Sequence, residues 1–293
     1  MPGENDLLKG AIDMHIHADP DAQKRKTNCI ELVQNAKAHG MGGVLIKDHV
    51  TVTSDRAYIL NKMFPDFKVY GSVVLNYPVG GLNPSAVEGA IALGCRVVYM
   101  PTYCALNQIS LLGKGPAPHA HPFPKDAQGI SLLDGKGNLV AEAYEILEIL
   151  AKTKVTLATG HISPEESMKL IQAAKQHKVE RILVTHASLK KLTFMDPADQ
   201  IEAVRMGAYI EHCFVVATEL TRPVGITSTE EIASQIKAVG ADHCVMSTDF
   251  GQAVNPHPVE GFKQFVFQML QTGFSDNEIE KMIRRNPLRL LED

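Results

Sequence analysis

The stretch IDMHIHADP, residues 12–20, carries the strongest structural signal in the chain. It is an apolar run of strand length in which Asp13, His15 and His17 occupy alternate positions. Because side chains alternate between the two faces of a strand, we expect these three to share one face. Two histidines separated by one residue can ligate a single metal ion, whereas burying two such rings without partners is costly. The stretch therefore predicts a strand that ends in a metal-binding pair.

Short apolar runs recur along the chain, and each is followed by a polar loop and by a segment with helical periodicity. The expected strands lie near Ala11–His17, Gly43–Lys47, Val69–Leu75, Cys95–Pro101, Val155–Ala158, Arg181–Thr185, Ala208–Glu211 and Cys244–Thr248. The expected helices lie near Asn28–His39, Ser54–Met63, Pro84–Leu93, Ala141–Ala151, Pro164–Gln176, Pro197–Met206, Thr229–Val239 and Pro258–Gln271. This alternation predicts an α/β protein with a single domain over residues 1–293, folded as a closed (β/α)8 TIM barrel. An open doubly wound sheet is the alternative.

The composition excludes several classes of protein. Of the 293 residues, 45% are hydrophobic and 21% are charged, which is enough apolar content to fill a core without disulfides. The net charge of −4 and the absence of a long basic run argue against nucleic-acid binding. We find no apolar run of about 18 residues that could span a membrane. We therefore expect a cytoplasmic protein that acts on a small molecule and, on general grounds, forms a homo-oligomer.

Three more strands are followed by residues of the types that bind metals in proteins. His161 comes directly after the fifth expected strand, His186 after the sixth and Asp249 after the eighth. Active sites of barrels of this kind are built from the loops that follow the strands, so these side chains should meet His15 and His17. Neutral imidazoles with a carboxylate suit a divalent metal, zinc first, with manganese or iron as alternatives.

The segment from 102 to 138, between the fourth strand and its helix, is rich in glycine, proline and histidine. Loops of that length are uncommon unless they are functional, so we expect a lid-like insertion, with a plain surface excursion as the alternative. Residues that could contact a substrate are Lys47, Tyr103, His119, His121 and His212. Lys47 could bind an anion, be carboxylated as a metal bridge, or simply extend its amine to solvent, and His212 could equally be a buried structural histidine.

The histidine pair after the first strand, the single histidines after the fifth and sixth, and the aspartate after the eighth resemble the amidohydrolase superfamily. The ending RRNPLRLL, residues 284–291, is also similar. The resemblance implies that His15, His17 and His161 bind metal. It also implies that His186 binds a second metal or polarises the substrate, and that Asp249 is ligand and general base. One feature differs, because VVYMPTYC, residues 97–104, holds no lysine or glutamate that could bridge two metals.

A second resemblance concerns the first two strands. The segment GVLIKDHVTVTSD, residues 43–55, looks like the second strand of the polymerase-and-histidinol-phosphatase (PHP) family, which ends in an Asp-His pair. Here that pair is Asp48 and His49, and His49 would then be a further metal ligand. The downstream Asp-x-His typical of that family is not found in this sequence.

These observations predict a metal-dependent hydrolase in which an activated water attacks an amide, ester or lactone-like bond. Asp249 would move the proton and His186 would stabilise the developing negative charge. Three alternatives stay open: a PHP-like phosphoesterase, a decarboxylase that uses Lys47 or Arg222 beside the metal, and a non-catalytic barrel that binds a metal or a ligand.

Overall fold

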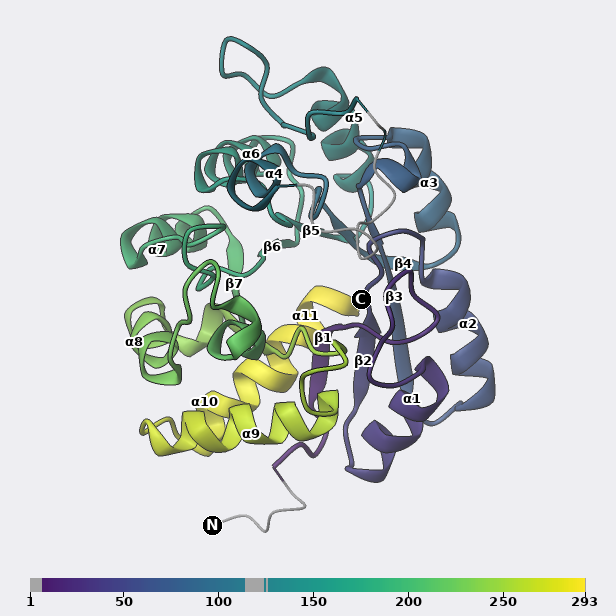
Figure 1. The fold of residues 1–293 in the computed structure, drawn as a ribbon, viewed down its shortest axis with the longest axis vertical. Coiled ribbons are helices and arrows are strands. Elements are labelled where there is room, and N and C mark those ends of the chain that lie inside the picture. The colour runs from purple at the N-terminus through teal and green to yellow at the C-terminus, as the bar shows by residue number, and fades with distance from the viewer. Residues whose placement is uncertain (1–6, 114–123, 125, 293) are drawn as a thin grey trace.

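A computed structural model describes residues 7–113, 124 and 126–292. Eight parallel strands follow one another around a barrel in chain order, with helices on the outside (Figure 1). The strands are β1 (Ile12–Ile16), β2 (Gly43–Ile46), β3 (Lys68–Val74), β4 (Cys95–Tyr99), β5 (Thr156–Ala158), β6 (Ile182–Val184), β7 (Ala208–Cys213) and β8 (Cys244–Ser247). The predicted single-domain (β/α)8 barrel is confirmed, and the open sheet is excluded.

The helices begin where the sequence provides start signals. Pro164, Pro197 and Pro258 open their helices, and Ser163 forms a capping box with Glu166. The α-helices are α1 (Cys29–Ala38), α2 (Ser54–Met63), α3 (Pro84–Ala92), α4 (Leu106–Leu112), α5 (Ala141–Leu150), α6 (Pro164–Gln176), α7 (Pro197–Arg205), α8 (Thr229–Val239), α9 (Pro258–Gln271), α10 (Asp276–Glu280) and α11 (Asn286–Leu291). Short 3₁₀ turns are η1 (Tyr77–Val79), η2 (Phe214–Ala217), η3 (Glu219–Thr221) and η4 (Ala241–His243), and η5 (Lys281–Arg285) is a π-helical turn. No helix in the described part of the chain has both the length and the apolar character to cross a membrane.

The hydrophobic side chains form two cores. The larger one lies between the strands and the helices, and the smaller one fills the interior of the barrel. Leu290 and Leu291 of α11 belong to the interior core, so the C-terminal segment closes one end of the barrel. Asn286 fixes this segment by donating to the carbonyls of Ala241 and Cys244. The opposite end, where the strands finish, is left for polar side chains.

The prediction that Asp13, His15 and His17 share one face of the first strand is wrong for Asp13, whereas His15 and His17 both reach the same Asp249 oxygen. The pairing of β1 with β2 shifts register between Asp13 and Ile16, which places one extra residue in β1. Met14 packs in the barrel interior and Ile16 in the outer core, so the alternation changes at this bulge. Asp13 is left outside the interior, where its carboxylate accepts hydrogen bonds from the hydroxyl and backbone amide of Thr248. The bulge is therefore what turns His15 inward.

The insertion after β4 is anchored at its base. The amide of Leu106 donates to the carbonyl of Ile130, and the amide of Ile130 donates to the carbonyl of Cys104. Helix α4 belongs to this insertion and lies over the strand ends. His119 and His121, which we expected to contact substrate, lie outside the described residues, and the lid role of the segment stays a prediction.

The barrel closes between β1 and the residues that follow β8. The amide of Asp249 donates to the carbonyl of His15, and the amide of His17 donates to the carbonyl of Phe250, each over 2.8 Å. Gly251 makes this seam possible, because a Cβ atom at that position would lie 2.0 Å from the His17 carbonyl oxygen. Its φ of 138° is also one that side chains disfavour.

We expect Gly251→Ala to lower the free energy of unfolding by about 2 kcal/mol or more, because the new methyl group must push the two ends of the seam apart. Urea unfolding followed by circular dichroism measures this. The control is Gly207→Ala, where φ is 101° but a Cβ atom would meet nothing within 4 Å. Equal losses for the two variants would show that the seam does not depend on the missing side chain.

Candidate metal centre

Four of the predicted residues meet at the C-terminal end of the barrel. Asp249 lies among them, with Oδ1 3.2 Å from His15 Nε2 and 3.1 Å from His17 Nε2. Its Oδ2 lies 3.5 Å from His186 Nε2. Both His186 and Asp249 have left-handed backbone conformations, with φ of 55° and 53°, directly after their strands. Such strain in non-glycine residues is concentrated at functional sites.

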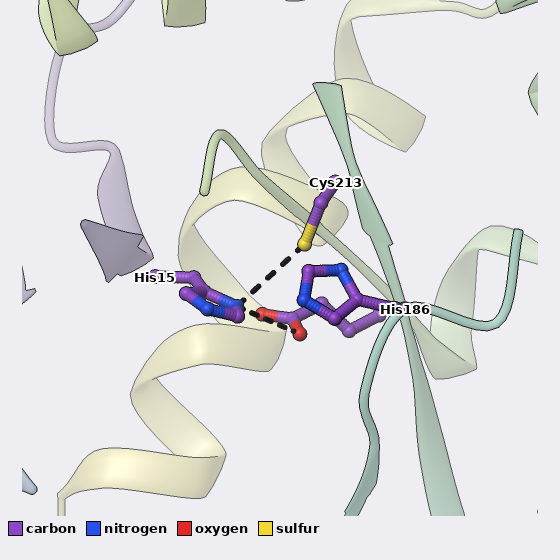
Figure 2. Close-up of side chains that lie close together, drawn as sticks. His15, His186 and Cys213 are labelled. Atoms are coloured by element: carbon purple, nitrogen blue, oxygen red, sulfur yellow. Dashed lines mark hydrogen bonds and ion pairs between the residues drawn. The ribbon is translucent and has the colours of Figure 1, made fainter. Parts of the chain in front are cut away.

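Strand β7 adds two side chains that the sequence analysis did not assign to the site. Glu211 Oε2 lies 3.2 Å from His15 Nδ1, and the thiol of Cys213 lies 3.7 Å from the same nitrogen. Figure 2 shows the rings of His15 and His186 on either side of a common space, with Cys213 pointing toward His15. When His15 Nδ1 donates its proton to Glu211, the lone pair on Nε2 faces Asp249; metal-binding histidines usually donate their other ring N–H to a carboxylate in this way.

These side chains form two overlapping sets of potential ligands. One consists of His15, His17 and Asp249, and the other of His15, His186, Glu211 and Cys213; within each set the ligand atoms lie within 4.8 Å of one another. Burial lowers the pKa of His15 and of His186 well below 6.5, so both rings are neutral, as metal binding requires. The donor set of imidazoles and carboxylates, with one thiol, fits a divalent ion of the zinc type.

Lys47, which follows β2 directly, reaches into this cluster. Its ammonium nitrogen lies 2.9 Å from His15 Nε2 and 4.8 Å from the centre of the Tyr99 ring. Burial lowers the pKa of Lys47, while the charges of Asp249 and Glu211 oppose that shift. Burial also raises the pKa of Asp249 to about 7, and Lys47 opposes that shift in turn. Lys47 and a metal ion therefore compete for the same lone pair on His15.

His49 and His161 lie beside the cluster but belong to neither ligand set. The His49 ring stacks on His17 at a centroid distance of 4.7 Å, and its Nδ1 is 2.9 Å from the hydroxyl of Thr102. His161 is hydrogen-bonded through Nδ1 to the Gln108 side chain of α4, and its ring centre is 5.2 Å from that of His186. Their predicted roles as metal ligands stay predictions.

The structure places His212 away from the cluster, contrary to its expected contact with substrate. It lies between Glu211 and Cys213, both of which face the interior, so its ring points to the outer core. There His212 Nδ1 is 2.6 Å from the hydroxyl of Ser188. The alternation along β7 groups Glu211 with Cys213 in the sequence EHC, but only the register of the strand shows that their face is the interior one. Gln108 could not have been found, because it comes from the insertion.

A cavity of about 160 Å³ opens above the cluster. Lys47, His49, His161, His186 and Asp249 line it, and Tyr103 lies beside them, 4.2 Å from the centre of the His49 ring. The cavity gives a small molecule access to the groups that could bind a metal. Tyr103 and Lys47 are thus placed where contact with substrate is expected, and that contact stays a prediction.

Comparison with known proteins identifies one family. The model of a family of unknown function (DUF6282) matches residues 10–211. No curated protein matches the sequence. Similar solved structures include an amidohydrolase from Pseudomonas aeruginosa, 13% identical, with 98% of each chain covered and a TM-score of 0.65. They also include 2,6-dihydroxybenzoate decarboxylase from Rhizobium, 11% identical, with 97% of this chain and 98% of that chain covered and a TM-score of 0.61.

A third similar structure is the organophosphorus hydrolase from Deinococcus radiodurans. It is 11% identical, covers 97% of this chain and 93% of its own, and has a TM-score of 0.60. At these identities the likeness shows a shared barrel fold.

The reactivity of the cysteine thiols tests whether the core and the candidate metal centre are closed to solvent. All five cysteines are buried, and burial raises the pKa of Cys29 to about 11 and that of Cys95 to about 12. Burial also raises the pKa of Cys213. Because the raised pKa keeps each thiol protonated at pH 8, we expect iodoacetamide to leave the native, metal-free protein unlabelled while all five react in denaturant. Mass spectrometry counts the adducts, and rapid labelling of Cys213 in the native protein would contradict the described packing.

Proposed function

The chain belongs to the family of unknown function DUF6282, and we propose that it is a metal-dependent hydrolase of the amidohydrolase type. It would cleave an amide, ester or lactone-like bond in a small molecule. The observation that carries the proposal is the Asp249 carboxylate, held 3.1–3.5 Å from nitrogens of three histidines at the strand ends. That end of the barrel is where enzymes of this fold place their active sites. Two of the structures that share the fold are an amidohydrolase and an organophosphorus hydrolase, which supports the same class.

We infer that His15, His17 and Asp249 hold the metal, with His186 completing the ligands or binding a second ion. Zinc fits this set best, with manganese or iron as alternatives. A bound divalent ion lowers the pKa of a water molecule and polarises a carbonyl group. Glu211 orients His15 from behind, as carboxylates do for metal-binding histidines.

Asp249 has the environment of a general base. Its carboxylate borders the cavity, where it can take a proton from water and return it to a leaving group. His186 also lines the cavity and stays neutral, so it can donate a hydrogen bond to an oxygen that gains negative charge.

A decarboxylase is the second candidate, and Lys47 is the observation that favours it. The buried ammonium of Lys47 lines the cavity and could hold a substrate carboxylate. One structure with the same fold is a 2,6-dihydroxybenzoate decarboxylase. The PHP-like alternative has no such support, because Asp48 is turned toward Arg56, 2.9 Å away, and does not join His49.

The first test is the metal content of the purified protein, measured by elemental mass spectrometry before and after reconstitution with zinc, manganese or iron. We expect about one or two equivalents, lost in His17→Ala because that ring belongs to the proposed ligands. His212→Ala is the matched control, since His212 is also buried on a strand but faces the outer core. Glu211→Gln should weaken the metal affinity about 10- to 100-fold. A protein that binds no metal after reconstitution would leave a ligand-binding barrel as the better account.

The second test is turnover by the metal-loaded protein on a panel of nitrophenyl esters, anilides and lactones. Asp249→Asn should lower kcat by about 10²- to 10⁴-fold, because the substituted amide cannot accept the proton. Metal content is measured in parallel to separate loss of the base from loss of the ion. Asp48→Asn, also at a strand end, should leave kcat nearly unchanged. Release of carbon dioxide from aromatic acids without hydrolysis of any ester, anilide or lactone would favour the decarboxylase.

A further inference from the structure

We propose that the substrate carries an uncharged apolar group beside its reacting bond, a single ring or a branched alkyl chain. This inference rests on the proposed hydrolase function and adds the chemical class of the substrate. It follows from the shape, the lining and the charge of the cavity above the metal centre.

The cavity has a polar base and an apolar wall. The base is the metal centre itself, with Lys47, His186 and Asp249. The wall is built by the loops after β6 and β7 together with α4, and its apolar side chains are Leu112, Leu189, Leu192, Val215, Leu220 and Val224. A substrate whose reacting bond lies at the base therefore places its neighbouring group against this wall.

Two side chains of the wall are partly exposed to solvent. Leu112 is 43% exposed and Leu220 is 45% exposed, whereas Leu189 is only 7% exposed. Apolar surface that faces water inside a concave site gains free energy when a ligand covers it. A charged group in the same place would lose its hydration against these apolar side chains, without an opposite charge beside it in the described wall.

The described wall offers no cation to such a charged group. Arg222 lies in the same loop as Leu220, but its guanidinium is 72% exposed and is paired with Glu219. Arg25 lies behind His17, paired with Asp21 at 2.8 Å, and does not line the cavity. Lys47 lines the base, where its ammonium contacts His15. The charge pattern therefore accepts a polar reacting group at the base and excludes a carboxylate at the wall.

The volume sets the size of the group. An apolar cavity of about 150 Å³ accepts one benzene molecule. The cavity here measures about 160 Å³, including the space next to the metal centre. It therefore has room for one ring, or for a branched alkyl chain of similar size.

The experiment uses hydroxamates, which bind metal ions directly and need no turnover. Calorimetry on the zinc-loaded protein compares acetohydroxamate, benzohydroxamate and 4-carboxybenzohydroxamate. We expect benzohydroxamate to bind about tenfold or more tightly than acetohydroxamate, because its ring covers the wall. The added carboxylate of the third probe should remove that gain.

Variants of the wall make the test specific. Leu112→Asn and Leu220→Asn should each weaken benzohydroxamate several-fold and leave acetohydroxamate unchanged. Leu111→Asn is the control, because Leu111 is 50% exposed on the same helix and does not line the cavity. Equal affinity for the first two probes, or tighter binding of the carboxylated one, would overturn this inference and leave the metal centre standing. Failure of all three probes to bind would overturn the proposed metal chemistry and this inference with it.

Discussion

The charged groups of Asp249, Glu211 and Lys47 lie close together at the end of the barrel, and the arrangement of the site depends on how these charges are balanced. The Glu211 carboxylate and the Lys47 ammonium group are buried at the end of the barrel, and the Asp249 carboxylate beside them is only 14% exposed, among histidines that burial keeps neutral. Taking ions out of water costs several kcal/mol each unless opposite charges compensate. With both carboxylates ionised, the positive charges that act on them are those of Lys47 and of Arg25, whose guanidinium lies 3.4 Å from His17. Burial raises the pKa of Asp249 and the charge of Glu211 adds to that shift, so a divalent cation at this position would stabilise the ionised carboxylate.

Much of the fold could be predicted from the sequence because the barrel repeats one simple pattern. Each apolar run forms a strand, and proline and serine mark several helix starts. His15, His17, His186 and Asp249 could be grouped because parallel strands all finish at the same end of the barrel. The insertion follows β4 as expected, and its α4 contributes Gln108 to the site.

Other features of the site depend on a strand bulge, on strand register and on tertiary packing, which a single sequence does not show. The bulge in β1 adds one residue to this strand, and the sequence IDMHI contains no glycine or other turn residue that would indicate it. The face of Asp13 could therefore not be assigned correctly. Glu211 and His212 are neighbours, and only the registration of β7 decides which of them faces the interior. Gln108 reaches His161 from a helix whose position follows from tertiary packing.

The seam between β1 and the end of β8 joins parts of the chain that are more than 230 positions apart, as the bond between Thr248 and Asp13 shows. His15 and His17 lie on one side of it and Asp249 on the other. Contacts between such distant segments form late, because the entropy of closing a long loop must be overcome first. The complete set of proposed metal ligands therefore comes together only when the first and last strands have joined. A chain that is still being synthesised, or that has lost its last strand, holds the histidines without the carboxylate, so binding of a metal ion by the full proposed set would mark the end of folding.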